Sequence, residues 1–140
     1  MYEKHLKAIA DAWSTGNLDQ LDEYLAPDTV REAPKWMDTT ANSLNDLKNI
    51  ITDFRTAFPD ANVRVNAVAS GESISFCQWT FTGTNTGKGE FEPTGKKVTL
   101  EGASFHRYED GKLKHETAYF DALDFFTQLG IKDMARSAAG

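Results

Sequence analysis

The sequence predicts an α+β fold in which three helices precede an antiparallel sheet. Apolar residues repeat with helical spacing as far as Pro59 and alternate with strand spacing after it. This change of period separates helices from strands, which is typical of α+β proteins and not of doubly wound ones. One face of such a sheet must be covered, and amphipathic helices ahead of it can cover it.

The first two helices are expected to form a hairpin around Gly16, where the first helix ends. Asn17 and Gln20 have the spacing of a capping box that begins the second helix, and Pro27 ends it. The first helix carries one apolar stripe, which consists of Tyr2, Leu6, Ile9 and Trp13.

Residues 28–41 show little periodicity, although residues 29–32 can form a short strand. The third helix has the clearest pattern in the chain. Ser43, with Asp46 three residues later, is a typical helix start, and Pro59 closes the helix. Its broad apolar stripe consists of Leu44, Leu47, Ile50, Ile51, Phe54 and Phe58.

Four strands are expected after Pro59. The first begins near Val63, and the second covers residues 73–82. A long glycine-rich loop follows, and strands over residues 98–108 and 112–120 complete the sheet. Asp110-Gly111 between the last two strands is a strong hairpin signal.

A short helix is expected between Asp121 and Gly130, so a single domain covers residues 1–130 and a weakly ordered tail covers residues 131–140. The length of 140 residues also fits one domain. Fifteen basic and 21 acidic residues give a net charge of −6 without a basic stripe. This composition argues against nucleic acid or an anionic membrane as a partner.

Cys77 is the single cysteine, which excludes an internal disulfide and a cysteine-cluster zinc site, and we expect it to be a small buried hydrophobe. No apolar run is long enough to span a membrane, and the N-terminal residues do not resemble a secretory signal. We therefore expect a cytoplasmic protein.

A two-residue turn at Asp110-Gly111 pairs Glu109 with Lys112 and sets the register of the last hairpin. In this register, a bulge at Gly111 would exchange the two faces of the hairpin. One face of the hairpin in the regular register is polar enough for a pocket with a few convergent polar groups. It carries Leu100, Gly102, Ser104, His106, His115, Thr117, Tyr119 and Asp121, whereas the opposite face carries Glu101, Phe105, Arg107, Lys114, Glu116 and Phe120.

The polar face suits proton transfer. A carboxylate that aromatic side chains shield from water has a raised pKa, which brings it closer to general-base duty at neutral pH. A neighbouring His or Tyr can donate a hydrogen bond to an enolate oxygen. This chemistry needs no cofactor and no metal, and the sequence carries no nucleotide-binding loop or nucleophile elbow.

Four segments resemble the SnoaL-like polyketide cyclase (ester cyclase) family of the nuclear transport factor 2-like superfamily: FPDANVRV, QWTFTGTNTG, PTGKKVTLEGASFHRYEDGKL and FDALDFFTQLG. The stretch STGNLDQLDEYLAPDTV is similar to the second-helix region of that family, so the resemblance covers nearly the whole chain. It implies a cone-shaped, curved antiparallel sheet that N-terminal helices cover, with a deep apolar pocket. The sequence departs from the common family pattern at Glu32, Asn85 and Thr117.

The resemblance also implies a function. An Asp at the end of the last long strand is the acid/base of an aldol closure in characterised cyclases, and Asp121 matches it, with His106 on the preceding strand. The implied activity is a cofactor-independent cyclase or isomerase that acts on a small apolar carbonyl compound. The expected substrate-site residues are His115, Tyr119, Thr117, Glu32, Trp36, Trp79 and Tyr24.

Other interpretations stay open. Asp121 also has the position of a helix N-cap, and the tryptophans suit a core. A non-catalytic small-molecule binding or carrier module is the alternative function, and a dehydratase or epoxide hydrolase is the third. Family members often form homodimers through the outer sheet face, and Phe105 and Phe120 are expected there.

Overall fold

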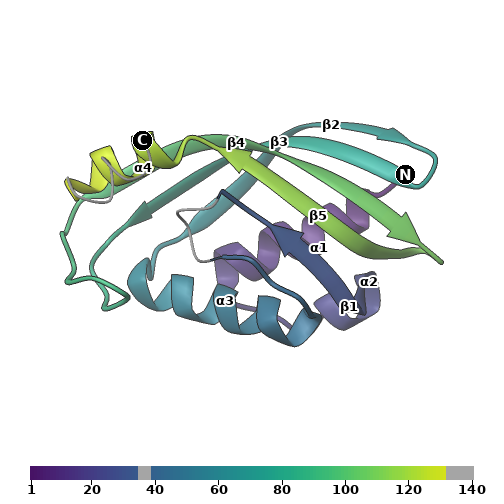
Figure 1. Cartoon of the computed structure of the whole chain (residues 1–140), viewed down its shortest axis with the longest axis horizontal. Coiled ribbons are helices and arrows are strands. Elements are labelled where there is room, and N and C mark those ends of the chain that lie inside the picture. Colours follow the sequence, from purple (N-terminus) through teal and green to yellow (C-terminus); the bar gives the residue numbers. More distant parts are fainter. Residues whose placement is uncertain (35–38, 132–140) are drawn as a thin grey trace.

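Helices and a five-stranded sheet make up the computed structural model, which describes residues 1–34 and 39–131 (Figure 1). The α+β class is confirmed. Of the expected tail, only Ile131 lies within the described residues. The elements are α1 (Glu3–Thr15), α2 (Leu21–Tyr24), β1 (Leu25–Glu32), α3 (Leu44–Ala57), β2 (Asn62–Gly71), β3 (Ile74–Thr84), β4 (Lys97–Glu109), β5 (Lys112–Phe120) and α4 (Ala122–Leu129).

The sheet has the order β1-β5-β4-β3-β2, in which β2 to β5 are antiparallel neighbours and β1 pairs in parallel with β5 at the edge. The four strands predicted after Pro59 are therefore confirmed, as is a strand over residues 29–32. That strand extends back to Leu25.

The second helix is much shorter than predicted. Leu25, expected in this helix, and Pro27, expected to end it, both belong to β1, because Leu25, Thr29 and Arg31 turn buried side chains toward the helices with strand spacing. The capping box is also wrong. The side chain of Asn17 accepts a hydrogen bond from the backbone N–H of Asp19, and α2 has no side-chain cap.

The predicted ends of the long helices are confirmed. Gly16 follows α1 in the left-handed conformation with φ of 78°, which glycine adopts without steric cost. The side chain of Ser43 accepts a hydrogen bond from the backbone N–H of Asp46 and caps α3. The turn at Asp110-Gly111 is confirmed too, since both residues have positive φ, as a two-residue type I′ hairpin requires.

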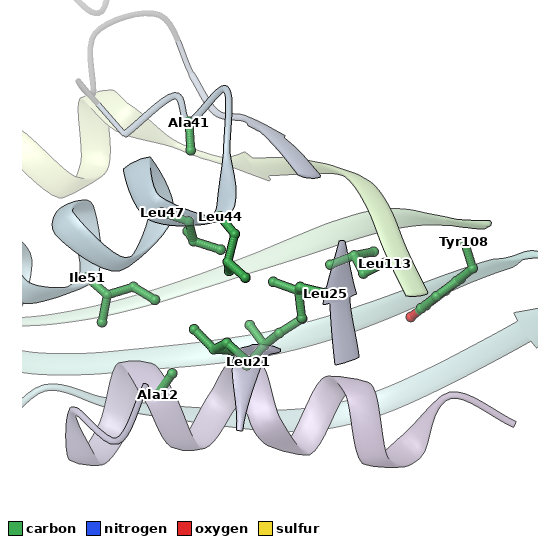
Figure 2. Packing of buried hydrophobic residues seen from close by; sticks show 10 residues of the cluster. Ala12, Leu21, Leu25, Ala41, Leu44, Leu47, Ile51, Tyr108 and Leu113 are labelled. Carbon is green, nitrogen blue, oxygen red and sulfur yellow. The ribbon is translucent and has the colours of Figure 1, made fainter. Parts of the chain in front are cut away.

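Helices α1 and α3 lie on the same side of the sheet, and α4 lies at the end of the sheet beside β4 (Figure 1). Two apolar clusters fill the space between the layers. One cluster joins α1, α2, α3 and β1, and Figure 2 shows Leu21, Leu25 and Leu47 within it. The other joins the end of α3 to α4 and includes Phe58, Phe81 and Phe126. Both clusters contribute to the walls of the cavity described below.

Candidate active site

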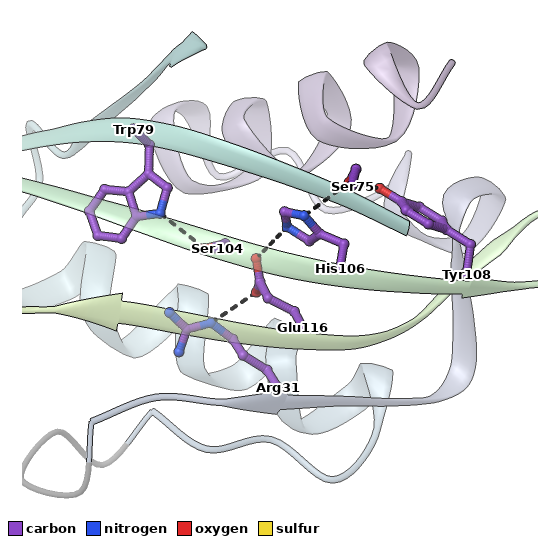
Figure 3. A network of polar contacts seen from close by, with 7 residues as sticks. All are labelled: Arg31, Ser75, Trp79, Ser104, His106, Tyr108 and Glu116. Atoms are coloured by element: carbon purple, nitrogen blue, oxygen red, sulfur yellow. Dashed lines mark hydrogen bonds and ion pairs between the residues drawn. The ribbon is translucent and has the colours of Figure 1, made fainter. Parts of the chain in front are cut away.

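A row of polar side chains crosses the inner face of the sheet (Figure 3). Each lies directly opposite the next on a neighbouring strand: Ser75 opposite His106, His106 opposite Glu116, and Glu116 opposite Arg31. We call these four residues the polar row. All four are buried. The sheet register thus brings together residues as far as 85 positions apart in sequence.

Hydrogen bonds connect the whole row. Nε2 of His106 lies 3.0 Å from Oε2 of Glu116, and Nε of Arg31 donates to Oε1 of Glu116 at 3.1 Å. At the other end, Oγ of Ser75 lies 3.1 Å from Nδ1 of His106 and 2.8 Å from the hydroxyl of Tyr108. Glu116 is therefore held by a hydrogen-bond donor on each carboxylate oxygen.

The partners fix the direction of these hydrogen bonds. An ionised carboxylate can only accept, so Nε2 of His106 carries a proton and donates to Glu116. On the other side of the ring, Nδ1 is hydrogen-bonded with Oγ of Ser75. Burial raises the pKa of Tyr108 to about 12, so its hydroxyl stays protonated in its hydrogen bond with Ser75. A continuous chain of hydrogen bonds thus leads from Tyr108 through Ser75 and His106 to Glu116.

Glu116 is an ionised carboxylate at neutral pH. Burial by itself raises the pKa of this group, but the hydrogen bond from His106 and the charge of Arg31 outweigh burial. Together with the charge of His106 and the hydrogen bond from Arg31, they lower the pKa from 4.5 to about 2. The negative charge is thus stabilised by its neighbours and not by water.

Arg31 is fixed from two further sides. Its Nη1 donates to the backbone carbonyl of Thr39 at 2.7 Å, and its guanidinium carbon lies 5.4 Å from the centre of the Trp13 ring. A guanidinium above an aromatic face adds a cation–π attraction. The loop after β1 and helix α1 therefore both hold the cation that faces Glu116.

A cavity of about 90 Å³ lies between the polar row and the helices; we call it the inner cavity. Its walls are mainly apolar, with Trp13 from α1, Val65 from β2 and Phe125 from α4. Its polar lining residues are Arg31, Thr39, Ser104, His106 and Glu116, together with the indole of Trp79, whose Nε1 donates to Oγ of Ser104 at 3.0 Å. A carboxylate in such a cavity can act on an apolar molecule away from bulk water.

Only part of the predicted site lies in this cavity. His106 and Trp79 line it, as expected. The predicted register of the last hairpin is wrong beyond Tyr108: the pairing shifts at Lys114, so Arg107 lies opposite His115 and His106 opposite Glu116. A bulge exchanges the faces of every later residue. It lies inside β5 and not at Gly111.

The shift places the remaining predicted residues of β5 on the outer face. Tyr119 is 60% exposed, Thr117 lies opposite Phe105, and His115 lies 3.5 Å from the exposed carboxylate of Glu32. None of these four predicted site residues lines the inner cavity. Phe120, expected on the outer face, lines the cavity instead.

Asp121 is exposed and caps α4, because its Oδ1 accepts a hydrogen bond from the backbone N–H of Asp124. It is not among the cavity residues. Tyr24 packs at the edge of the first apolar cluster, beside His5. Trp36 lies outside the described residues.

Sequence reasoning missed Glu116 and Arg31 as site residues. Glu116 was placed on the outer face by the regular hairpin register, and no residue around Lys114 signals the bulge. The sequence contains one weak indication that Arg31 faces inward: it follows Thr29 at the spacing of a strand, in a segment without an apolar stripe of its own.

The part of the chain that the structure describes shows neither a metal-binding cluster nor a membrane-spanning helix. Residues 1–34 and 39–131 contain no group of three or more His, Cys, Asp or Glu side chains that could hold a metal ion. No helix within these ranges is long and apolar enough to cross a membrane.

The family model of the SnoaL-like polyketide cyclases matches residues 3–129. No protein of curated function matches the sequence. Among solved structures, IdmH, a candidate polyketide cyclase from Streptomyces antibioticus, is 21% identical with a TM-score of 0.77, over 91% of this chain and 96% of that one.

Two further structures have the same fold. A candidate polyketide cyclase from Acidithiobacillus ferrooxidans is 25% identical with a TM-score of 0.74, over 91% of this chain and 92% of that one. A candidate SnoaL-like polyketide cyclase from Jannaschia sp. CCS1 is 16% identical with a TM-score of 0.76, over 90% and 91%.

Proposed function

Because the chain belongs to the SnoaL-like polyketide cyclase family, we propose that it is a cofactor-independent cyclase or isomerase of a small apolar carbonyl compound. The observation that carries the proposal is the ionised carboxylate of Glu116 at the wall of an apolar cavity, held between His106 and Arg31. In this proposal, Glu116 takes the acid/base role that the sequence suggested for Asp121.

The proposed reaction begins when the carbonyl compound enters the inner cavity and displaces water. Glu116 takes the proton from the carbon next to the carbonyl group, and the electron pair of that C–H bond forms an enolate. The enolate carbon then bonds to a second carbonyl carbon, and the resulting alkoxide recovers the proton from Glu116. In an isomerisation, the proton returns to another carbon of the same molecule. Atoms and charge balance in both cases.

His106 and Arg31 have supporting roles in this reaction. Their hydrogen bonds leave each carboxylate oxygen of Glu116 with one lone pair that no other residue of the polar row uses. A low pKa makes a carboxylate a weak base, so the apolar ligand must increase its basicity by excluding water. Ser104 and Trp79 also line the cavity, and the Ser104 hydroxyl and the Trp79 indole N–H can stabilise the enolate oxygen.

Uptake of deuterium by a ketone tests the proposal without knowledge of the natural substrate. β-Tetralone in heavy water exchanges the hydrogens next to its carbonyl group, and proton NMR follows the loss of signal. We expect the protein to accelerate this exchange. Glu116→Gln should lower the acceleration by about a hundredfold or more, which is the range for loss of a general base.

Asp121→Asn is the matched control, because it also exchanges a carboxylate for an amide but lies outside the cavity. We expect it to keep exchange within about twofold of the unmodified chain. Near-UV circular dichroism checks that both variants fold. Exchange that survives in folded Glu116→Gln, or that is lost in Asp121→Asn, would refute the assignment.

One observation favours a second candidate, a non-catalytic binding module. Both ring nitrogens of His106 and both carboxylate oxygens of Glu116 already have partners inside the protein. A network whose members already have partners within the protein can serve simply to shape a pocket. A small molecule that stays bound through purification, together with no exchange of ketones, would support this candidate.

The outer face of the sheet supports a proposed homodimer. Phe76 and Phe105 stack there with ring centres 4.5 Å apart, and Phe76 is half exposed. Tyr119 lies on the same face, and Arg107 lies over the Phe105 ring. Exposed aromatic groups together with Arg are typical of interfaces. Native mass spectrometry that finds only monomer at micromolar concentration would remove this proposal.

A further inference from the structure

A second, larger cavity of about 650 Å³ opens between α3, the loop at residues 88–91 and α4; we call it the outer cavity. Thr39, Phe54 and Phe125 line both the inner and the outer cavity. The two cavities are therefore adjacent, with these three residues in the wall of both.

The two cavities differ in chemistry. The inner one is mainly apolar, whereas the outer one carries Asn49 and Asp53 on α3 and Lys88 and Glu90 on the loop. These side chains include both donors and acceptors, which is the set that hydroxyl groups can satisfy. With Asp46, the outer cavity has three carboxylates against one lysine, and this balance disfavours an anionic ligand.

Thr39 has an unusual position at the junction. Its side chain is buried, with the residue only 8% exposed, and its Oγ1 has no hydrogen-bond partner among the described residues. Buried hydroxyl groups are nearly always paired in native proteins, because an unpaired one loses its hydration without compensation. Phe54 and Phe125, which share the junction, offer no polar atom that could satisfy it.

The polar row also holds Thr39 in place. Nη1 of Arg31 donates to the backbone carbonyl of Thr39 at 2.7 Å, while Nε of the same guanidinium donates to Glu116. The backbone of Thr39, which carries this hydroxyl, is thus tied through Arg31 to the carboxylate that we propose as the base. A ligand whose reacting carbon lies at Glu116 and that reaches the outer cavity crosses the wall that Thr39 shares with Phe54 and Phe125.

We propose that Thr39 is a ligand-binding residue and that the ligand has two parts. An apolar ketone part occupies the inner cavity, and an uncharged, hydroxyl-bearing part occupies the outer cavity, with Oγ1 of Thr39 hydrogen-bonded to the polar part where the cavities meet. This inference deepens the proposed function, because it takes the inner cavity as the place of the ketone.

Calorimetric titration with matched ketones tests the inference. The probes are β-tetralone with a propyl, a hydroxypropyl or a carboxyethyl chain on its aromatic ring. We expect the hydroxypropyl probe to bind the unmodified chain about tenfold more tightly than the propyl probe, the effect of one well-placed hydrogen bond. The carboxyethyl probe should bind most weakly.

Three variants connect this preference to Thr39. Thr39→Val removes the hydroxyl at nearly constant shape and should abolish the tenfold preference without lowering thermal stability, because the hydroxyl has no partner among the described residues to lose. Thr39→Ser keeps the hydroxyl and should keep the preference. Thr99→Val is the matched control, since Thr99 is exposed on β4 and lines neither cavity, and should change nothing.

Equal affinity for the propyl and hydroxypropyl probes would overturn the inference, as would a preference that survives in Thr39→Val or an absence of binding at millimolar concentration. Deuterium exchange in the same samples separates this inference from the proposed function. Tight, hydroxyl-selective binding without exchange would refute only the proposed function. Exchange without hydroxyl selectivity would refute only the role of Thr39.

Discussion

At the scale of single residues, Gly102 explains how Trp79 fits into the cavity wall. Gly102 lies directly opposite Trp79 on β4, and a Cβ atom built on it would meet the six-membered part of the indole ring at 2.3 Å. Real Cβ atoms do not approach other atoms so closely. The missing side chain therefore leaves the space in which the indole lies while its N–H reaches Ser104.

Gly102→Ala is expected to displace the indole of Trp79 and to destabilise the fold by about 1–3 kcal/mol, the usual cost of overpacking. Urea unfolding and the tryptophan emission maximum would measure the two effects. Trp79→Phe supplies the control, because the smaller phenyl ring lacks the indole atoms that a Cβ atom at position 102 would meet. In that background Gly102→Ala should cost clearly less, and an equal cost in both backgrounds would contradict the explanation.

Single residues also show where prediction from sequence succeeded. His106 and Trp79, which were expected as site residues, both face the inner cavity, because the strand alternation on their side of the bulge is regular; their roles stay predictions. The buried state expected of Cys77 is confirmed, and its burial raises the pKa of the thiol to about 11. Thr39 could not be found in this way, since an unpaired hydroxyl is a property of three-dimensional packing and leaves no periodic signal.

At the scale of elements, α4 depends on its N-cap. The carboxylate of Asp121 accepts a hydrogen bond from the backbone N–H of Asp124. The helix itself buries Phe125, Phe126 and Leu129 in the second apolar cluster. The cap therefore stabilises a helix that closes one end of the inner cavity, to which Phe125 also belongs. The N-cap interpretation of Asp121 made from sequence is confirmed.

Asp121→Ala should lower the free energy of unfolding by about 1 kcal/mol, the typical value for loss of a side-chain cap. Asp121→Asn should stay within a few tenths of a kcal/mol of the unmodified chain, since Asn caps helices as well as Asp does. Urea unfolding compares the two variants. Equal destabilisation by both would mean that the charge of Asp121, and not its hydrogen bond, matters.

The glycine-rich loop between β3 and β4 has its own anchor. Asn85 is fully buried; its side-chain amide donates to the backbone carbonyl of Ala57, and its Oδ1 accepts from the backbone N–H of Thr94. This residue was noted as a departure from the common family pattern. The structure shows it tying the loop to the end of α3.

The limits of prediction at this scale have physical causes. Long helices and strands were predicted because many residues repeat one period, whereas α2 and the start of β1 are too short for a period to appear. One extra residue at Lys114 changed the face of every residue after it in β5. Because of this shift, the regular register predicted Glu116 on the outer face and Tyr119 and His115 in the site, whereas the structure has them the other way round.

At the scale of the whole molecule, the inner face of the sheet holds a buried pair of charged residues, Arg31 and Glu116, whereas Phe76 and Tyr119 are exposed on its outer face. The polar row runs across four strands between two apolar clusters, so the ionised Glu116 lies among buried apolar residues. Breaking a buried ion pair by removal of one partner typically costs about 3–5 kcal/mol. The site and the stability of the fold are therefore coupled through the same carboxylate.

This coupling has a pH dependence whose sign follows from the pKa of Glu116. Its native pKa of about 2 lies below the unfolded value of 4.5, so the unfolded chain binds more protons at this group between these two pH values. The contribution of Glu116 to stability is complete above pH 4.5 and is lost as the pH falls toward about 2. Acid unfolding should therefore be shallower in Glu116→Gln over this window.

The most direct test of the central claim, an ionised Glu116 in the cavity wall, is a carboxyl NMR titration of the ¹³C-labelled protein with and without β-tetralone. Glu116→Gln assigns the resonance, and Asp121 serves as an exposed reference. We predict that Glu116 remains ionised at pH 4.5, with its native pKa near 2, and that its carboxyl shift responds to the ketone while that of Asp121 does not. A Glu116 that titrates at 4.5 or above and ignores the ketone would contradict the account.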